Sequence, residues 1–247
     1  PIWLAVSDQR KRMSCCSGIS IPGHMPMSEL EELKRRSAQQ AAAYVHDHMV
    51  LGLGTGSTVR WLIEELGRQK DRQQLQIVSS SLVSKKRAEQ AGLWVVEPDV
   101  IDHIDLVIDG VDQINPRKQV IKGGGGALVR EKILAEEAKQ VIWIMDTSKR
   151  VETIEDYALP VEIVPFSRSF VQRKLEHLGY AVKLRMRRDG TFLTDNQNYI
   201  LDVSIPAAHT IQDAHEELMH IAGVVETGYF HLDAMCITAG MTEVALW

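Results

Sequence analysis

The sequence predicts an α/β fold in which a Rossmann-like parallel sheet carries a smaller α+β, ferredoxin-like domain. In the first part of the chain, short apolar runs alternate with segments of helical periodicity. Polar and glycine-rich clusters directly follow several of these runs. The alternation changes after Pro160, which predicts a second domain. We expect a large Rossmann-like domain over 27–155 plus 224–247, and a small domain over 156–223.

Composition indicates an ordinary globular protein of one large or two small domains. Of the 247 residues, 45% are hydrophobic and 25% are charged, and the net charge is −5. This acidic balance argues against a dedicated nucleic-acid binder. No apolar stretch approaches the roughly 18 residues that cross a bilayer, so no membrane partner is expected. Three cysteines, an odd number, indicate a reducing, cytoplasmic compartment rather than a disulfide framework.

Residues 1–26 are excluded from the fold prediction. The basic cluster at 10–12 follows the apolar residues 2–6, which is the reverse of the order in a signal peptide. Residues 23–25, Gly-His-Met, resemble a cloning scar. We therefore expect this segment to be a tag or a disordered extension.

From Met27 onward the elements follow from periodicity and from capping residues. Ser28, with Glu31 and Glu32, is typical of a helix start. Further helices are predicted over 59–66, 84–91, 127–139, 169–178 and 210–220. Strands are predicted over 49–53, 76–79, 105–109, 141–145, 161–164, 181–186, 199–203, 224–230 and 234–238, and the last two are expected to return to the first sheet.

The predicted parallel sheet places several polar loops together. The loops 54–58, 79–81, 109–113 and 146–149 each follow a strand of that sheet. In open α/β sheets, ligands bind outside the carboxyl ends of the strands. The sequence therefore predicts a ligand site at this edge.

One of these loops, 52–58, is rich in glycine and hydroxyl side chains. Between a strand and a helix, its backbone amides can point at an anion. The glycine spacing is G-x-G-x-G, so it is neither a dinucleotide fingerprint nor a Walker A loop, which would need a lysine. A tight turn with no ligand is an equal alternative on spacing alone. Thr55, Ser57 and Thr58 favour a phosphate.

The segment 105–131 holds the strongest chemical signal. The apolar run ends at Asp109, and Asp112, Lys122, four glycines and Glu131 follow. Aspartates in such a turn often serve only as caps, and most helical glutamates are solvated. Four consecutive glycines, however, are costly to order unless a ligand needs bare backbone. Acids, a lysine and free amides together favour proton transfer on a small anionic substrate.

Two other features allow a simpler interpretation. Lys149 follows a strand, where an ordinary surface lysine is equally plausible. His215 and His220 imitate a zinc-protease motif, but they are five residues apart and face different sides of a helix. No Cys/His spacing matches a structural zinc site. No metal site is therefore expected.

Together these motifs resemble the type A ribose-5-phosphate isomerase family, from about Met27 to the C-terminus. The matching segments are GLGTGST (52–58), SSS (79–81), DGVDQIN (109–115), IKGGGGALVREK (121–132), DTSK (146–149), LPVEIVPF (159–166) and DGTFLTDNQNYILD (189–202). The combination is specific, although each piece alone is not. Gln113 is a departure, because the family usually carries an acid there.

The resemblance implies cofactor-free interconversion of ribose 5-phosphate and ribulose 5-phosphate. Glu131 would move the proton between C2 and C1, Asp109 and Asp112 would contact the sugar hydroxyls and assist ring opening, and Lys122 would stabilise the enediolate. The implied substrate-binding residues are Lys34, Thr55, Gly56, Ser57, Thr58, Gly110, Gly123, Gly124, Gly125 and Lys149. A homodimer or homotetramer is expected on the same ground.

Two alternatives stay open at this point. An amino-sugar phosphate deaminase of similar fold would need a histidine partnered with acids, and the matched loops hold none. A non-catalytic sugar-phosphate sensor would be expected to lack the base, whereas Glu131 is present. On the sequence alone, the isomerase is favoured.

Overall fold

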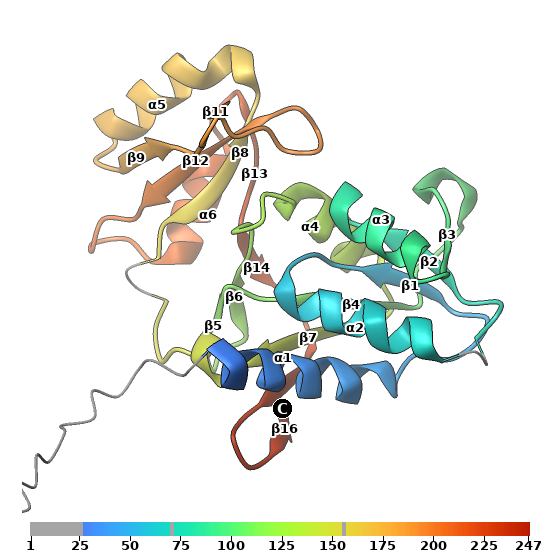
Figure 1. Cartoon of the computed structure of the whole chain (residues 1–247). Coiled ribbons are helices and arrows are strands. Elements are labelled where there is room, and N and C mark those ends of the chain that lie inside the picture. Colours follow the sequence, from blue (N-terminus) through green and yellow to red (C-terminus); the bar gives the residue numbers. More distant parts are fainter. Residues whose placement is uncertain (1–26, 70–71, 155–156) are drawn as a thin grey trace, which may run out of the picture.

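The computed structural model describes residues 27–247 except 70–71 and 155–156. The expected N-terminal extension, 1–26, lies outside the described residues. Helices alternate with strands from Met27 onward, and the chain forms two parts, each built on its own sheet (Figure 1). Within the described residues, no helix is both long and apolar enough to cross a membrane.

The larger part is built on a seven-stranded sheet of order β16-β15-β7-β4-β1-β2-β3. Neighbouring strands are parallel except for β16, which is antiparallel to β15. The strands are β1 (Val50–Leu53), β2 (Gln76–Ser79), β3 (Trp94–Val95), β4 (Leu106–Gly110), β7 (Val141–Asp146), β15 (Met235–Ala239) and β16 (Val244–Leu246). The Rossmann-like prediction is confirmed.

Both faces of this sheet are covered, as expected for apolar strands without polar alternation. Leu51 and Ile108 pack into one core with Leu62, while Val107 and Trp143 pack into a second core on the opposite face. The helices are α1 (Met27–Ala42), α2 (Ser57–Arg68), α3 (Leu82–Gln90) and α4 (Leu128–Glu137). The alternation of neighbouring strand residues between two cores explains why these strands are apolar throughout.

The smaller part holds a four-stranded antiparallel sheet of order β13-β8-β12-β9. With its helices, the chain order is β-α-β-β-α-β, the ferredoxin-like arrangement that the sequence predicted. The elements are β8 (Leu159–Ile163), α5 (Arg168–His177), β9 (Ala181–Leu184), β12 (Tyr199–Ser204), α6 (Ile211–Met219) and β13 (Val224–Thr227). Short strands β10 (Met186–Arg187) and β11 (Gly190–Thr191) form a hairpin.

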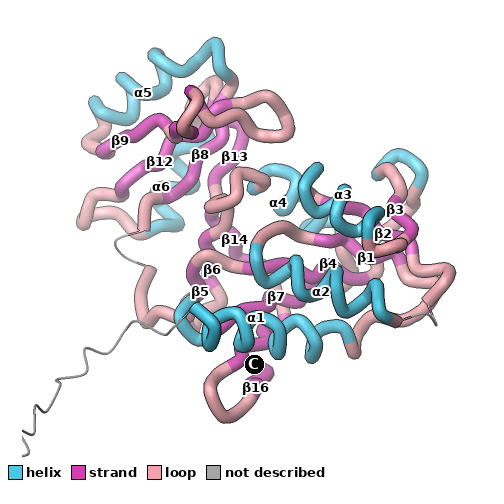
Figure 2. Tube along the Cα trace, viewed as in Figure 1, coloured by secondary structure: helices cyan, strands magenta, loops and turns pink. Residues whose placement is uncertain are grey.

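A third sheet lies between the two parts, as Figure 2 shows. It has the order β14-β6-β5 and consists of β5 (Gln113–Ile114), β6 (Gln119–Ile121) and β14 (Tyr229–His231). Single 3-10 turns complete the connections: η1 (Pro98–Val100), η2 (Thr147–Lys149) and η3 (Pro165–Ser167). The strand β6 ends directly before Lys122, so this third sheet fixes the position of the Lys122 backbone.

The single strand predicted over 224–230 is wrong. The chain forms β13 in the small sheet and then β14 in the third sheet, with Gly228 between them. The Gly228 N–H donates to the Pro160 carbonyl at 2.7 Å, and a Cβ at Gly228 would lie 2.1 Å from the Lys122 carbonyl oxygen. This close backbone approach divides the predicted strand into two. Of the strands that follow residue 223, β15 and β16 belong to the large sheet, while β13 and β14 do not. The division into domains at 156 and 223 stays a prediction. The strand β13, which the sequence analysis assigned to the large domain, pairs within the small sheet.

Candidate active site

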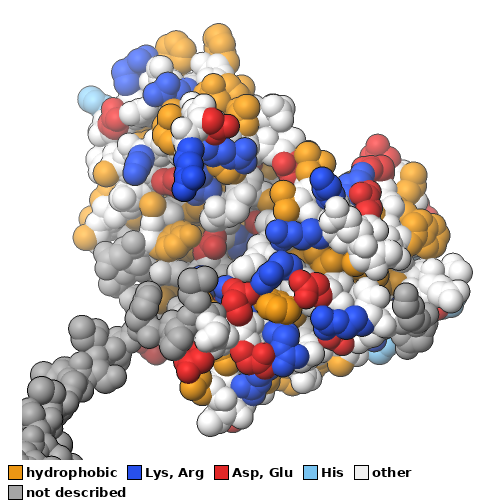
Figure 3. Space-filling view, viewed as in Figure 1, with side chains coloured by type: hydrophobic (Ala, Val, Ile, Leu, Met, Phe, Trp, Pro, Cys, Tyr) orange, Lys and Arg blue, Asp and Glu red, His pale blue; other side chains and the backbone are white. Residues whose placement is uncertain are grey.

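The carboxyl ends of β1, β2, β4 and β7 meet at one edge of the large sheet. Parallel register places Leu53 beside both Ser79 and Ile108, and Gly110 beside Ile144. The loops that follow these strands therefore converge, as the predicted parallel sheet implied. Figure 3 shows Lys and Arg side chains on both parts of the molecule, beside the hollow that separates them.

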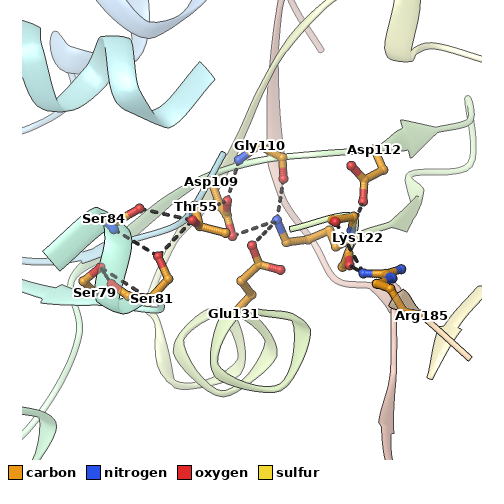
Figure 4. A network of polar contacts seen from close by, with 12 residues as sticks. Thr55, Ser79, Ser81, Ser84, Asp109, Gly110, Asp112, Lys122, Glu131 and Arg185 are labelled. Carbon is orange, nitrogen blue, oxygen red and sulfur yellow. Dashed lines mark hydrogen bonds and ion pairs between the residues drawn. The ribbon is translucent and has the colours of Figure 1, made fainter. Parts of the chain in front are cut away.

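The loop after β1 presents Thr55 to two serines. The Thr55 hydroxyl oxygen accepts hydrogen bonds from Ser81 at 2.9 Å and from Ser84 at 3.2 Å (Figure 4). Gly56, at φ 115°, precedes α2 and supplies no side-chain cap. The first amides of α2, at Ser57 and beyond, are thus left without a side-chain acceptor, which suits an anion.

Asp109 is buried at the end of β4, and both of its carboxylate oxygens have partners. Oδ1 accepts from the Thr55 N–H at 3.1 Å and from the Gly110 N–H at 2.6 Å, while Oδ2 lies 2.8 Å from Lys122 Nζ. Burial raises the pKa of Asp109, and Lys122 and the backbone donors oppose that rise. A Cβ at Gly54 would lie 1.9 Å from this carboxylate, so only glycine fits there.

Lys122 lies between two buried carboxylates. Its Nζ is 2.8 Å from Asp109, 3.3 Å from Glu131 and 2.5 Å from the Gly110 carbonyl oxygen, to which it donates. Only 3% of the lysine side chain is exposed. Burial by itself would lower the pKa of Lys122, but the two carboxylates outweigh burial and raise it. Lys122 is therefore a fixed positive charge at the centre of the site.

Glu131 lies in the first turn of α4, just beyond the glycine loop, and its side chain is 3% exposed. Oε1 faces Lys122, whereas Oε2 is buried and has no hydrogen-bond partner in the described part of the chain. Burial, with repulsion from Asp109, raises the pKa of Glu131 to about 8. One oxygen is thus held by Lys122, while the other has no hydrogen-bond partner (Figure 4).

Asp112 is half-buried and does not join the Lys122 ion pairs. Its Oδ2 accepts a hydrogen bond from the Gly124 N–H at 2.7 Å. A Cβ at Gly124 would lie 2.8 Å from the other oxygen, Oδ1, which explains a glycine at that position. Asp112 thus lies against the glycine loop, beside the cluster formed by Asp109, Lys122 and Glu131.

The two predicted phosphate lysines are not bonded to this cluster. Lys34, on α1, pairs with Glu31 at 2.9 Å, and Glu31 also accepts from Arg60 at 2.6 Å and from the Trp61 indole at 3.0 Å. Lys149 ends η2, next to the carboxyl end of β7. Among the described residues, no hydrogen bond or ion pair joins either lysine to Asp109, Lys122 or Glu131. Their role in phosphate binding stays a prediction.

Sequence reasoning missed Arg185, which reaches this site from the small sheet. It donates to the Gly123 carbonyl oxygen at 2.6 Å and pairs with Asp202. No local pattern signals such a role, because its partners are backbone carbonyls about 60 residues away in the chain.

Among the described residues there is no group of three His, Cys, Asp or Glu side chains that could hold a metal ion. His215 contacts Thr227, and His220 contacts the backbone of its own helix.

A family model described as ribose 5-phosphate isomerase A (phosphoriboisomerase A) matches residues 76–243. The chain belongs to the ribose 5-phosphate isomerase A family. It is 41% identical over 201 residues to the "Ribose-5-phosphate isomerase A" of Limosilactobacillus reuteri, covering 80% of this chain and 88% of the relative. It is 40% identical over 209 residues to the Bifidobacterium longum subsp. infantis protein of the same name, covering 83% and 90%.

Solved structures of the isomerase family have the same fold. The ribose 5-phosphate isomerase A of Methanocaldococcus jannaschii aligns with a TM-score of 0.82 at 33% identity, covering 88% of this chain and 98% of that one. A D-ribose-5-phosphate isomerase in complex with phospho-erythronic acid aligns with a TM-score of 0.83 at 32% identity, with the same coverage. Gln113, the position at which the sequence departs from the family pattern, lies on β5. Its side-chain oxygen Oε1 is buried and has no hydrogen-bond partner among the described residues.

Proposed function

We propose that this chain interconverts D-ribose 5-phosphate and D-ribulose 5-phosphate by enediolate proton transfer. The observation that carries the proposal is the Glu131 carboxylate, which has a pKa raised to about 8, one oxygen beside Lys122 and one buried oxygen without a partner. A base near neutral pH, next to a fixed cation, suits removal of a proton from the carbon beside a carbonyl.

The steps balance without any co-reactant. Glu131 Oε2 removes the C2 proton of the open-chain aldose, and the C2–H electrons form the C1–C2 double bond while O1 gains negative charge. Lys122 and the glycine-loop amides stabilise that charge. The protonated Glu131 then returns the proton to C1. The O2–H proton passes to O1, so O2 becomes the ketone oxygen and O1 becomes a hydroxyl. Substrate and product are isomers, so no oxidant or cofactor enters the balance.

The two aspartates have different surroundings, and we assign them different parts. Both Asp109 oxygens are engaged with the loop backbone and Lys122, so Asp109 mainly orients the lysine. Asp112 is half-buried, with one oxygen on Gly124, and is the better placed to contact sugar hydroxyls and assist ring opening.

The phosphate is assigned to the start of α2. Thr55, Gly56, Ser57 and Thr58 lie at the helix N-terminus, where the backbone amides and the helix dipole favour an anion. Lys34 and Lys149 are proposed to add positive charge. The family member solved in complex with phospho-erythronic acid supports a phosphorylated sugar as the substrate, because that compound carries a phosphate and a carboxylate that resembles an enediolate.

A colorimetric ketopentose assay tests the function. Ribose 5-phosphate incubated with the purified chain should yield ribulose 5-phosphate without added metal or cofactor. Binding of the sugar phosphate without turnover would instead indicate a sensor. Release of ammonia from an amino-sugar phosphate would indicate a deaminase.

We also propose that the chain is cytoplasmic and forms a homodimer or homotetramer. The assembly is inferred from the family resemblance, and the compartment from the low cysteine content. Static light scattering on the purified chain tests the assembly, and a monomeric mass would contradict it.

A further inference from the structure

Arg185 connects the small sheet to the glycine loop of the site (Figure 4). It lies between β9 and β10, where its N–H donates to the Ile200 carbonyl at 2.8 Å and its carbonyl accepts from the Phe192 N–H at 3.0 Å. Its backbone is therefore held on both sides by the smaller part of the molecule.

Asp202 holds the guanidinium in a fork. Arg185 Nε donates to Asp202 Oδ2 at 3.0 Å, and Nη2 pairs with Oδ1. The two side chains are only 15% and 25% exposed. A bidentate pair of this kind fixes the plane of the guanidinium. The remaining nitrogen, Nη1, is thereby aimed at the Gly123 carbonyl oxygen, at 2.6 Å, and at the Gly124 carbonyl oxygen, at 3.3 Å.

The peptide between Gly123 and Gly124 is bound at both ends. Its carbonyl oxygen accepts from Arg185, and its N–H donates to Asp112 Oδ2 at 2.7 Å. Because the C=O and N–H of a trans peptide point in opposite directions within one plane, the two side chains contact opposite edges of the same peptide group. A charged donor on the carbonyl also polarises the peptide and strengthens its N–H as a donor.

We propose that Arg185 is a positioning residue that sets the Asp112 carboxylate through the Gly123–Gly124 peptide. The glycine backbone is easily reoriented, and Gly123 has φ 102°. Within the loop, the Gly126 N–H donates to the same carbonyl oxygen at 3.0 Å, and Arg185 adds a charged donor from outside the loop at 2.6 Å. The proposal rests on the proposed function only in assigning the sugar hydroxyls to Asp112.

Two further hydrogen bonds join the smaller part to the larger part without involving Arg185. Arg130 Nε donates to Asn196 Oδ1 at 2.7 Å, and the Leu82 N–H donates to Asp195 Oδ2 at 2.8 Å. These bonds join the loop before β12 to α4 and α3 and do not involve Arg185. Loss of the Arg185 guanidinium should therefore act on the glycine peptide rather than on docking.

The test compares Arg185→Met with Arg187→Met. Both arginines lie over the Phe192 ring, at 5.7 Å and 4.4 Å, but Arg187 is exposed, and its side chain makes no hydrogen bond within the described residues. We expect Arg185→Met to lower kcat/KM about 10- to 100-fold, the usual effect of losing a charged hydrogen bond. Arg187→Met should stay within about twofold of wild type.

A double-mutant cycle with Asp112→Asn separates positioning from general support. If Arg185 acts through Asp112, the double variant should lose no more than about threefold beyond Asp112→Asn alone. Arg185→Lys can reach one carbonyl but cannot keep the fork on Asp202, so it should recover only part of the activity.

Additive losses in the cycle, or near-normal activity of Arg185→Met, would overturn the proposal. So would unfolding of both Arg185 variants at the assay temperature, because the residue would then be purely structural. Calorimetric binding of phospho-erythronic acid repeats the cycle without turnover. If the wild type bound that compound but did not isomerise, the proposed function would fail while the coupling of Arg185 to Asp112 was still measured.

Discussion

Glu131 and Lys122 meet through one oxygen only. Oε1 of the glutamate lies 3.3 Å from the lysine nitrogen, while Oε2 is buried without a partner among the described residues. The cation therefore orients the carboxylate without occupying the oxygen that can accept a proton. Burial raises the pKa of Glu131 to about 8 although Lys122 opposes that rise, so the glutamate is a stronger base than an ordinary carboxylate.

Replacing Glu131 with Gln should nearly abolish isomerisation. The amide keeps the size and can still accept a hydrogen bond from Lys122, but it cannot take a proton. We expect kcat to fall at least 10²–10⁴-fold, the usual contribution of a general base. The folded variant should still bind a substrate-like sugar phosphate, and exchange of the C2 proton with solvent deuterium should stop. Glu137→Gln, at an exposed position in the same helix, is the control. Near-normal turnover in Glu131→Gln would transfer the role of base to Asp109 or Asp112.

The activity should rise with pH up to about pH 8. The base must be ionised to act, and burial with repulsion from Asp109 raises the pKa of Glu131 to about 8. Below that value, kcat/KM should fall about tenfold per pH unit, since it reports the ionisation of the free enzyme. The measurement is kcat/KM between pH 5.5 and 9.5. Glu136→Gln, an exposed change in α4, should leave the midpoint unchanged. A profile that is flat below pH 8 would contradict the assignment.

Because its pKa is raised, the ionised Glu131 carboxylate should lower the free energy of unfolding at high pH. A carboxyl whose folded pKa lies above its unfolded value favours folding fully below the unfolded pKa of about 4.5, and that contribution is lost as pH rises through about 8. Glu131→Gln should therefore have a higher Tm than wild type at pH 9 but not at pH 5. Thermal unfolding of both proteins at the two values measures this, and an equal Tm difference at both would argue against the raised pKa.

Lys34→Ala and Lys149→Ala should mainly weaken substrate binding. The charge of the phosphate is the same in the ground and transition states, so its contacts appear in KM more than in kcat. Each loss of a charge-assisted hydrogen bond should raise KM about 10- to 100-fold. Lys174→Ala, at an exposed position on α5, provides the control for a lost surface lysine. A large fall in kcat at unchanged KM would contradict the phosphate assignment.

Gly54→Ala should inactivate the protein more severely than its small size suggests. The new Cβ would lie 1.9 Å from the Asp109 carboxylate, which is buried and fixed by Lys122 and the Thr55 N–H. We expect a loss of kcat/KM of about 100-fold or more, with destabilisation of about 1–3 kcal/mol from overpacking. Gly240→Ala, whose Cβ would meet only ordinary contacts, should be tolerated. Near-normal activity of Gly54→Ala would show that Asp109 can move freely.

The sequence by itself determined five strands of the large sheet, its helices and the loops that carry the chemistry. Apolar runs and helical spacing predicted the parallel strands, and the glycines and Asp109, Lys122 and Glu131 identified the reacting loop. These features are local, because periodicity and turn chemistry depend on neighbouring residues.

Only the tertiary structure decided how these residues act. The pKa of Glu131 depends on burial and on charges brought from other elements, and the free oxygen is defined by which atoms surround it. Arg185 escaped prediction because its acceptors are distant backbone carbonyls, which leave no mark in the side-chain pattern. The strand over 224–230 was mispredicted for a similar reason, since the close approach of Gly228 to the Lys122 backbone divides it. Contacts between residues far apart in the chain fix these properties, and local sequence patterns do not encode them.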